Sequence, residues 1–143
     1  MITAVTVSNE VDWAKLNVAL WPDHTLESRL RERAAGRCEF EYLYYLENQA
    51  VGFLSLAMRS DYVEGTRSSP VGYIEGIYVL PEFRRRGIAK ELVEFAKRWS
   101  LERGCAELAS DCESANSLSR VFHHKVGFVE ANILVCFTMD LQE

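Results

Sequence analysis

The sequence predicts a mixed α/β domain in which one β-sheet is flanked by helices, and three observations support this. The chain has 143 residues, which is long enough for a sizeable core and too short for two domains. Its 48% hydrophobic and 26% charged residues are typical of a soluble globular protein. Apolar patterns of period two and of helical period follow one another in the order βααβββαβαββ. We therefore expect a single domain over residues 1–143.

The first half of the chain is expected to contain three strands, at residues 2–7, 40–46 and 50–58. The last two are close enough to form a hairpin through the turn at 47–49. Asn9 can cap a helix whose apolar positions 13, 16, 20 and 21 share one face. Thr25 can cap a second helix through about residue 35, and Gly36 ends it.

The second half is expected to contain strands at residues 73–80, 105–110, 129–130 and 133–139. It is also expected to contain two helices, one over residues 88–102 and one with apolar positions at 118, 121, 122 and 126. Gly104 and Gly127 end them. The polar, turn-rich loop 59–71 is long for a compact domain, and loops of this length are often functional.

The stretch from Tyr73 to Glu91 contains the clearest functional signal. Its apolar strand breaks at Leu80-Pro81, and three consecutive arginines and Gly87 precede a helix. A helix that begins after such a loop directs free backbone N–H groups and the positive end of its dipole at one point. The sequence therefore predicts a site for a phosphate-bearing ligand.

The charge and the cysteines limit the possible partners. A net charge of −5 disfavours a general nucleic-acid binder, and it indicates either a cationic partner or a charge that serves only solubility. No apolar run is long enough for a membrane span, and the N-terminus lacks a basic n-region, so we expect a cytoplasmic protein without membrane association. The four cysteines have no metal-ligand spacing, so we expect reduced core residues and no metal site.

The motif Arg84-x-x-Gly87-x-Ala89, between a strand and a helix, resembles the acyl-CoA-binding motif of the GNAT superfamily of N-acetyltransferases. The order of the predicted elements and the positions of Asn116 and Gly127-Phe128 fit the same superfamily. The resemblance implies the acyl-CoA N-acyltransferase fold, a central and mostly antiparallel sheet that is splayed at the cofactor cleft and flanked by helices. It also implies acetyl-CoA as the co-substrate.

A narrower resemblance covers almost the whole chain. The segments LWPDH (20–24), DYVEGTRSSPV (61–71), EGIYVLPEFRRRGIAK (75–90) and ELASD (107–111) are similar to type I aminoglycoside 6'-N-acetyltransferases. This resemblance implies direct transfer of acetyl from acetyl-CoA to the 6'-amine of antibiotics such as kanamycin, in a ternary complex, with antibiotic resistance as the result. There are two alternatives. The first is a GNAT enzyme that acetylates a polyamine or a peptide or protein amine, and the second is a non-catalytic CoA-binding regulatory domain.

The resemblance implies two groups of cofactor-binding residues. The strand residues Ile77, Tyr78 and Val79 would offer backbone groups to the pantetheine arm. The pyrophosphate would be bound by the backbone of the loop and helix start, which comprises Arg85, Arg86, Gly87, Ile88, Ala89 and Lys90. Gly87 lacks a Cβ, so a pyrophosphate can approach closely. Asn116 would also bind the cofactor, although a helix cap is the structural alternative.

The acceptor residues carry the chemistry. Glu75 is a carboxylate in an otherwise apolar strand, a costly position unless the group is paired or used. Asp111 follows the next strand, so both carboxylates can face the cleft and hold a cationic amine. We expect Glu75 as first candidate for the general base and Asp111 as second, with structural ion pairing of Glu75 as the alternative. The resemblance adds Trp21, His24 and Tyr62 to the acceptor site; Trp21 can equally be a core residue.

Two positions depart from the family pattern. His123 stands where many superfamily members have a tyrosine that acts as general acid, so the acid is not assigned. Asn132 stands where related enzymes can carry an acidic residue near a subunit interface. We also expect a homodimer, because the strand at 133–139 has more hydrophobic surface than one sheet face needs.

Overall fold

The structure is a computed structural model that describes residues 1–142. The chain forms two compact units, Met1–Asp111 and a second unit that begins at Cys112. The first unit contains the sheet and three helices, and the second contains one helix. Nine of the eleven predicted elements are present in the predicted order.

The sheet of the first unit has five strands in the order of the chain. These are β1 (Ile2–Ala4), β2 (Phe40–Leu46), β3 (Gln49–Arg59), β4 (Val71–Val79) and β5 (Leu108–Ser110). Neighbouring strands from β1 to β4 are antiparallel, and only β5 runs parallel to its neighbour β4. The mostly antiparallel mixed sheet that the resemblance implied is therefore confirmed.

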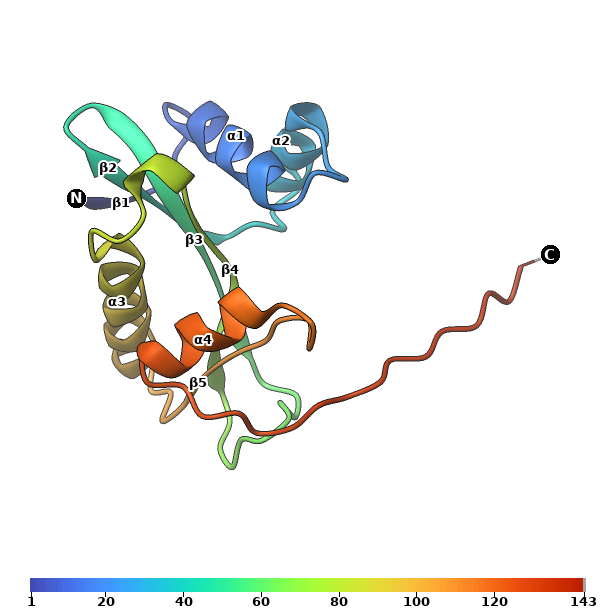
Figure 1. The fold of residues 1–143 in the computed structure, drawn as a ribbon. Helices are drawn as coiled ribbons and strands as arrows, with labels where there is room; N and C mark the ends of the chain where they lie inside the picture. Colours follow the sequence, from blue (N-terminus) through green and yellow to red (C-terminus); the bar gives the residue numbers. More distant parts are fainter. Residues whose placement is uncertain (143) are drawn as a thin grey trace. The chain divides into compact units, whose positions relative to one another are not determined.

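Helices cover both faces of this sheet. In Figure 1, α1 (Glu10–Leu20) and α2 (Leu26–Ala34) lie on one side, and α3 (Ile88–Glu102) lies on the other. Strand β2 alternates between the two layers, because Leu43 belongs to the core cluster of α1 whereas the ring of Tyr42 lies 4.6 Å from that of Phe95 on α3. Because β2 is buried on both faces, its residues 42–46 form a continuous apolar run and do not alternate with polar residues.

The sheet splays after the first residues of β4, as the resemblance implied. Strand β5 pairs with β4 from Gly72 to Ile74, whereas β4 continues to Val79. Parallel strands that separate in this way leave peptide groups of β4 without a strand partner on that side. The open part of β4 contains Glu75 and the three residues expected to contact pantetheine.

Two strands are shorter than expected because local hydrogen bonds begin or end them. The N–H of Thr6 donates to Asn9 Oδ1 at 2.7 Å, and this turn ends β1 at Ala4. The N–H of Cys105 donates to the carbonyl of Ser100 at 3.0 Å, so this residue is held in the turn that follows α3. Strand β5 therefore starts at Leu108 and not at 105.

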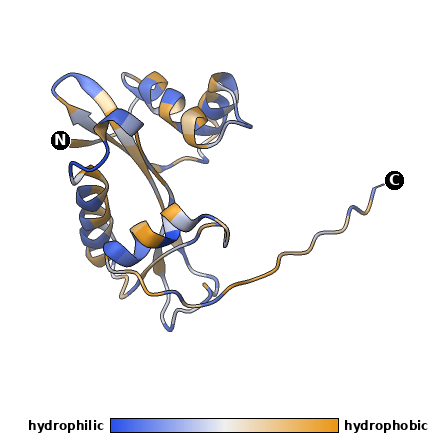
Figure 2. Ribbon diagram, in the orientation of Figure 1, coloured by the Kyte–Doolittle hydropathy of each residue, from blue (hydrophilic) through white to orange (hydrophobic). Residues whose placement is uncertain are grey.

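The second unit departs most from the expectation. It contains α4 (Ser117–Lys125), but the strands expected at 129–130 and 133–139 are absent from the described part of the chain. Those two expectations are wrong for the single chain. A strand needs an edge to pair with, whereas this segment makes local hydrogen bonds such as Ile133 N–H to Asn132 Oδ1 at 2.8 Å. Figure 2 shows that much of the segment is nonetheless hydrophobic.

The cysteines are divided between two environments. Cys38 and Cys105 are buried in the first unit, as expected, and Cys112 and Cys136 are exposed. The expectation of four core cysteines is wrong for the latter pair, because Cys112 lies in a connection and Cys136 in the segment without strand structure. Among the described residues, no helix is long and apolar enough to cross a membrane.

Candidate active site

A β-bulge in β4 places Glu75 at the site. Ser55 of β3 is opposite Gly76 and Leu56 is opposite Ile74, so Glu75 is the additional residue between the two pairs. A bulge redirects a side chain out of the regular alternation, and bulges are frequent beside active sites. The Glu75 side chain is consequently 38% exposed in a strand whose neighbours on both sides are buried.

A pocket of about 440 Å³ opens in front of this bulge. Trp21, His24 and Glu75 all line it, so three of the five residues predicted for the acceptor site lie together. The rest of the wall comes from α2, the connection to β2, and β2 and β3: Arg29, Glu32, Arg37, Cys38, Glu39, Phe40, Glu41, Ser55, Leu56, Ala57 and Met58. Four of the lining residues are glutamates and two, Arg29 and Arg37, are arginines, so acidic side chains are in excess, which suits a cationic ligand.

Trp21 follows α1 directly, and the edge of its indole ring packs against the bulged part of β4. A Cβ placed on Gly76 would lie 2.6 Å from Cζ2 of Trp21, which shows how closely the ring approaches the strand. The indole also lies 5.6 Å from the ring of Phe53 and 5.5 Å from the guanidinium of Arg29. Trp21 is therefore both a core residue and a wall of the pocket, so the two predicted roles are compatible.

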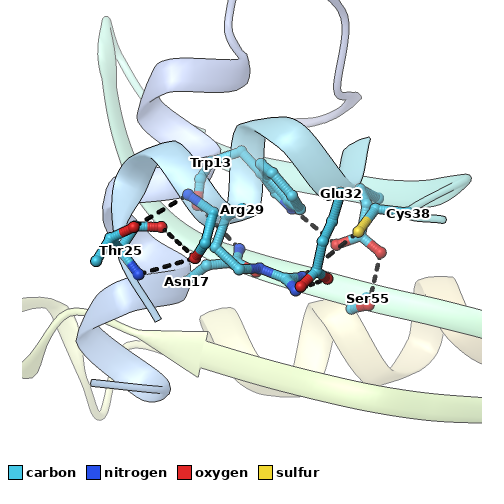
Figure 3. Close-up of polar contacts among 9 residues, drawn as sticks. Trp13, Asn17, Thr25, Arg29, Glu32, Cys38 and Ser55 are labelled. Carbon is cyan, nitrogen blue, oxygen red and sulfur yellow. Dashed lines mark hydrogen bonds and ion pairs between the residues drawn. The ribbon is translucent and has the colours of Figure 1, made fainter. Parts of the chain in front are cut away.

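The pocket wall includes a buried arginine, Arg29. Figure 3 shows the Arg29 side chain extending from α2 to three partners. Its guanidinium donates to Asn17 Oδ1 at 3.1 Å, to Glu32 Oε2 at 2.7 Å and to Cys38 Sγ at 3.5 Å. These bonds fix α2 against α1 and against the segment that leads into β2. Sequence reasoning missed Arg29, because an arginine on a polar helix is normally exposed and only the tertiary contacts distinguish it.

Glu41 was also missed, although it is the most perturbed carboxyl group of the pocket. Its oxygens accept from Trp13 Nε1 at 2.7 Å and from Ser55 Oγ at 2.6 Å. Burial raises the pKa of Glu41 to about 7, and the two hydrogen bonds oppose this effect only in part. The alternation of β2 could have placed Glu41 on the inner face, but its partners are distant in sequence.

Asp111 does not line the pocket but is linked to Glu75 through two other side chains. Arg59 Nη2 lies 2.8 Å from Glu75 Oε1, and its guanidinium carbon lies 3.5 Å from the ring centroid of Tyr73. The hydroxyl of Tyr73 donates to Asp111 Oδ2. Burial and this hydrogen bond raise the pKa of Tyr73, so the phenol keeps the proton that it donates. The ion pair that was the alternative for Glu75 is thus present.

Tyr62 lies apart from the pocket in the described structure. It is 74% exposed, and its hydroxyl accepts from the N–H of Gly65 at 3.3 Å. The loop that carries it is anchored at its far end, where Glu107 accepts from the N–H of Arg67 at 2.8 Å and from the hydroxyl of Ser68. The hydrogen bonds from Ser68 and Arg67 lower the pKa of Glu107.

The loop before α3 has the conformation expected of an anion site. A short 3₁₀ turn (Pro81–Phe83) follows β4, and Arg84 Nε then donates to the carbonyl of Val79 at 2.9 Å. Arg85 and Gly87 have positive φ angles of 65° and 80°. The first hydrogen bond of the helix runs from the N–H of Glu91 to the carbonyl of Gly87 at 3.0 Å. The backbone N–H groups before Glu91 therefore have no acceptor within the helix.

Gly87 has two physical reasons to be glycine. Its φ of +80° is unfavourable for a residue with a side chain, and no described heavy atom lies within 4 Å of the position of an added Cβ. The space in front of this backbone is therefore available to a ligand. These features fit the pyrophosphate of CoA, which takes backbone donors and the positive end of α3.

Asn116 and His123 belong to the second unit. Asn116 is the N-cap of α4, and its Oδ1 accepts from the N–H of Ser119 at 3.1 Å. The helix cap given as the alternative for Asn116 is thus present. His123 lies on the same helix, with Nδ1 2.7 Å from the carbonyl oxygen of Ser119.

Comparison with known proteins agrees with this geometry. Residues 8–128 match the acetyltransferase (GNAT) family. The chain belongs to the GNAT acetyltransferase family. The predicted superfamily and fold class are confirmed by this match and by the solved structures that this GNAT protein resembles.

The similar GNAT proteins share almost the full length of the chain. The aminoglycoside N(6')-acetyltransferase type 1 of Acinetobacter genomosp. 13 is 40% identical over 140 residues, which are 95% of each chain. The structure of AAC(6')-Iy in complex with the bisubstrate analogue CoA-S-monomethyl-acetylneamine superposes with a TM-score of 0.92 at 33% identity, over 98% of this chain and 97% of that one. The apo enzyme AAC(6')-IG from Acinetobacter haemolyticus gives a TM-score of 0.92 at 35% identity over 99% of both chains.

Proposed function

We propose that this protein is an acetyl-CoA-dependent aminoglycoside 6'-N-acetyltransferase that confers resistance to these antibiotics. Near-full-length relatives at up to 40% identity have this activity in their names, and one similar structure holds an analogue that joins CoA to an acetylated neamine. The observation that carries the proposal for this chain is the pocket that joins Trp21, His24 and Glu75 at the open part of β4.

The cofactor half of the site consists of consecutive residues. Acetyl-CoA supplies the acetyl group as a thioester. The backbone of Ile77, Tyr78 and Val79 binds the pantetheine arm along the unpaired side of β4, as an added strand would bind. The amides from Arg85 to Lys90 bind the pyrophosphate, with Gly87 at the point of closest approach. Asn116 is a further candidate for cofactor binding, on the family resemblance alone.

The acceptor half holds a polycation. The aromatic wall of Trp21 and the imidazole of His24 border the bound amine, and Glu75 and Asp111 attract its ammonium groups. The 6'-ammonium loses its proton before it attacks, and Glu75, at the bulge, accepts that proton directly or through a water molecule. Asp111 is the second candidate for this role. Tyr62, which lies apart from the pocket on the 60–70 loop, would approach the acceptor only after a movement of that loop.

The acetyl group moves directly to the amine in a ternary complex. Cys38 is the thiol in the pocket wall, and burial raises its pKa, so it stays protonated and is a poor nucleophile. A covalent acetyl-cysteine is therefore disfavoured. Free thiols at Cys38, Cys105, Cys112 and Cys136 are consistent with a reducing, cytoplasmic location.

The protein acts as a homodimer in this proposal. Large apolar side chains from Val129 to Leu141 are between 61% and 89% exposed, which is unusual for a soluble surface. A second copy would bury them and would offer the edge that residues 133–139 need to form a strand. Size-exclusion chromatography with light scattering tests this. A monomer at micromolar concentration contradicts it.

Glu75→Gln tests the function and the site together. Thiol release from acetyl-CoA is followed with kanamycin as acceptor, and we expect kcat to fall by about 10²- to 10⁴-fold, the usual contribution of a general base. Glu102→Gln, at an exposed position on α3, is the matched control. A wild-type protein that acetylates a polyamine or peptide amine but no 6'-amino aminoglycoside refutes the function. A fully active Glu75→Gln enzyme refutes the site alone.

A further inference from the structure

Glu41 is a buried carboxyl group in the wall of the acceptor pocket. The residue is only 4% exposed, yet it lines the same pocket as Glu75. Its two oxygens accept hydrogen bonds from Trp13 Nε1 and Ser55 Oγ, at 2.7 and 2.6 Å. An indole N–H and a hydroxyl are neutral donors, so they stabilise an ionised carboxylate through their dipoles and supply no positive charge.

The arginines near Glu41 are bonded to other carboxylates. Arg29 Nη1 lies 2.7 Å from Glu32 Oε2 (Figure 3), and Arg33 Nε lies 3.4 Å from Glu10 Oε2. Both arginines favour the ionised form of Glu41, but less than its two hydrogen bonds do. Among residues 1–142, none forms an ion pair with Glu41. An ionised Glu41 therefore has no counter-charge in contact, and burial raises its pKa to about 7.

A cationic ligand in the pocket would supply this counter-charge. A sphere with the pocket volume of about 440 Å³ is roughly 9 Å across, so an ammonium group inside it lies within about that distance of the pocket wall. At this distance, with an effective dielectric constant of about 20, opposite unit charges favour one another by at least roughly tenfold. A bound ammonium group therefore favours the ionised form of Glu41 by about that factor.

We propose that Glu41 is an additional acceptor-binding residue, whose carboxyl group ionises when an aminoglycoside ammonium enters the pocket and then acts as its counter-charge. The proton of the carboxyl group passes to the solvent. This inference rests on the proposed function, because it takes the pocket to be the acceptor site. Its role differs from that of Glu75, because Glu41 takes no proton from the attacking amine.

The other charged groups around the pocket do not obscure the effect of Glu41. Besides the two arginine–glutamate pairs, the titratable and charged groups that face it are His24, Arg37, Cys38, Glu39 and Glu75. These groups are the same in wild type and in Glu41→Gln, and so are the amines of the ligand. Their contributions cancel in the difference between the two proteins.

The experiment measures kanamycin binding by calorimetry from pH 5.5 to pH 8, with saturating CoA, in wild type and Glu41→Gln. Because binding ionises Glu41, the wild-type affinity should increase as the pH rises towards 7. With a tenfold preference, the wild-type Kd should fall roughly five- to tenfold more over this range than the Kd of Glu41→Gln. At pH 6.5, buffers of different ionisation enthalpy should show that wild type releases about half a proton more per bound kanamycin.

Two further variants make the result interpretable. Ser55→Ala keeps the carboxyl group of Glu41 but removes one of its hydrogen bonds, so the midpoint of the pH dependence should move to higher pH. Glu102→Gln, at an exposed position on α3, should keep the wild-type profile. An unchanged affinity for CoA shows that each variant is folded.

The proposal is overturned if the Kd values of wild type and Glu41→Gln change with pH in parallel, or if the two proteins release equal numbers of protons. A loss of affinity that is the same at every pH indicates a purely structural role of Glu41 and overturns it too. Should Glu41→Gln not fold, an unmoved midpoint in Ser55→Ala overturns it. Wild type that binds no kanamycin refutes the proposed function, whereas binding with parallel profiles refutes only the role of Glu41.

Discussion

Replacing Gly76 by alanine should disturb the acceptor pocket through Trp21. The added Cβ would lie 2.6 Å from Cζ2 of the indole, well inside van der Waals contact. Since carbon atoms pack at about 3.5–4.0 Å, the ring has to move by roughly 1 Å. The ring of Phe53 and the guanidinium of Arg29, at 5.6 and 5.5 Å, restrict this movement.

The cost follows from these contacts. Overpacking of one methyl group in a restricted site usually costs about 1–3 kcal/mol of stability. We therefore expect Gly76→Ala to lower the free energy of unfolding by this amount. A misplacement of about 1 Å near the reacting groups can cost roughly 10²-fold in rate, so kcat/KM for kanamycin should fall between about tenfold and a hundredfold.

Urea unfolding and steady-state kinetics with both substrates measure the two effects. A double-mutant cycle with Trp21→Leu isolates the contact, because the smaller side chain leaves space for the methyl group. We expect Gly76→Ala to be less destabilising in the Trp21→Leu background by about 1 kcal/mol or more. Equal destabilisation in both backgrounds, or a Gly76→Ala enzyme with normal stability and activity, would refute the reasoning.

Two further predictions concern the cofactor loop and the buried carboxyl group. Gly87 and Gly104 both have a φ near +80° and open space at the Cβ position, so Gly87→Ala and Gly104→Ala should each lose about 1–2 kcal/mol of stability. Only Gly87→Ala should weaken CoA binding in calorimetry. Equal CoA affinities of the two variants would contradict the assignment of the loop to the cofactor. Burial raises the pKa of Glu41 to about 7 from 4.5, so the folded state binds more protons between these values and its stability falls as pH rises through this window. Relative to Glu41→Gln, wild type should lose roughly 2–4 kcal/mol of unfolding free energy between pH 5 and pH 8. If the unfolding free energies of the two proteins change with pH in parallel, the raised pKa of Glu41 is contradicted.

The parts of the fold that were predicted correctly depend on local sequence. Thr25 caps α2 and bonds reciprocally with Ser28, and Gly87 starts α3 at the predicted residue. These features need only residues within one turn of each other. The loop from Pro81 to Gly87 is also local, because its backbone course is set by the end of β4 and the start of α3; that it binds the cofactor stays a prediction.

The structure brings together part of the predicted acceptor site. Trp21, His24 and Glu75 meet in one pocket as expected, and the link from Asp111 through Tyr73 and Arg59 was not expected. Arg29 and Glu41 had no local signal, because their partners are supplied by other helices and strands. Tyr62 lies on an exposed loop, and the residues beyond Gly127 form no strand in the described part of the chain.

The sequence by itself determined the order of the helices and of the five strands of the sheet, the family motif and the loop that starts α3, because each depends on neighbouring residues. Only the tertiary structure decided how a bulge exposes Glu75, how Gly76 receives the ring of Trp21 and how Arg59 comes to lie on Glu75. These contacts join residues separated by 16 to 55 positions, and their geometry depends on strand register and helix packing, which no local pattern specifies.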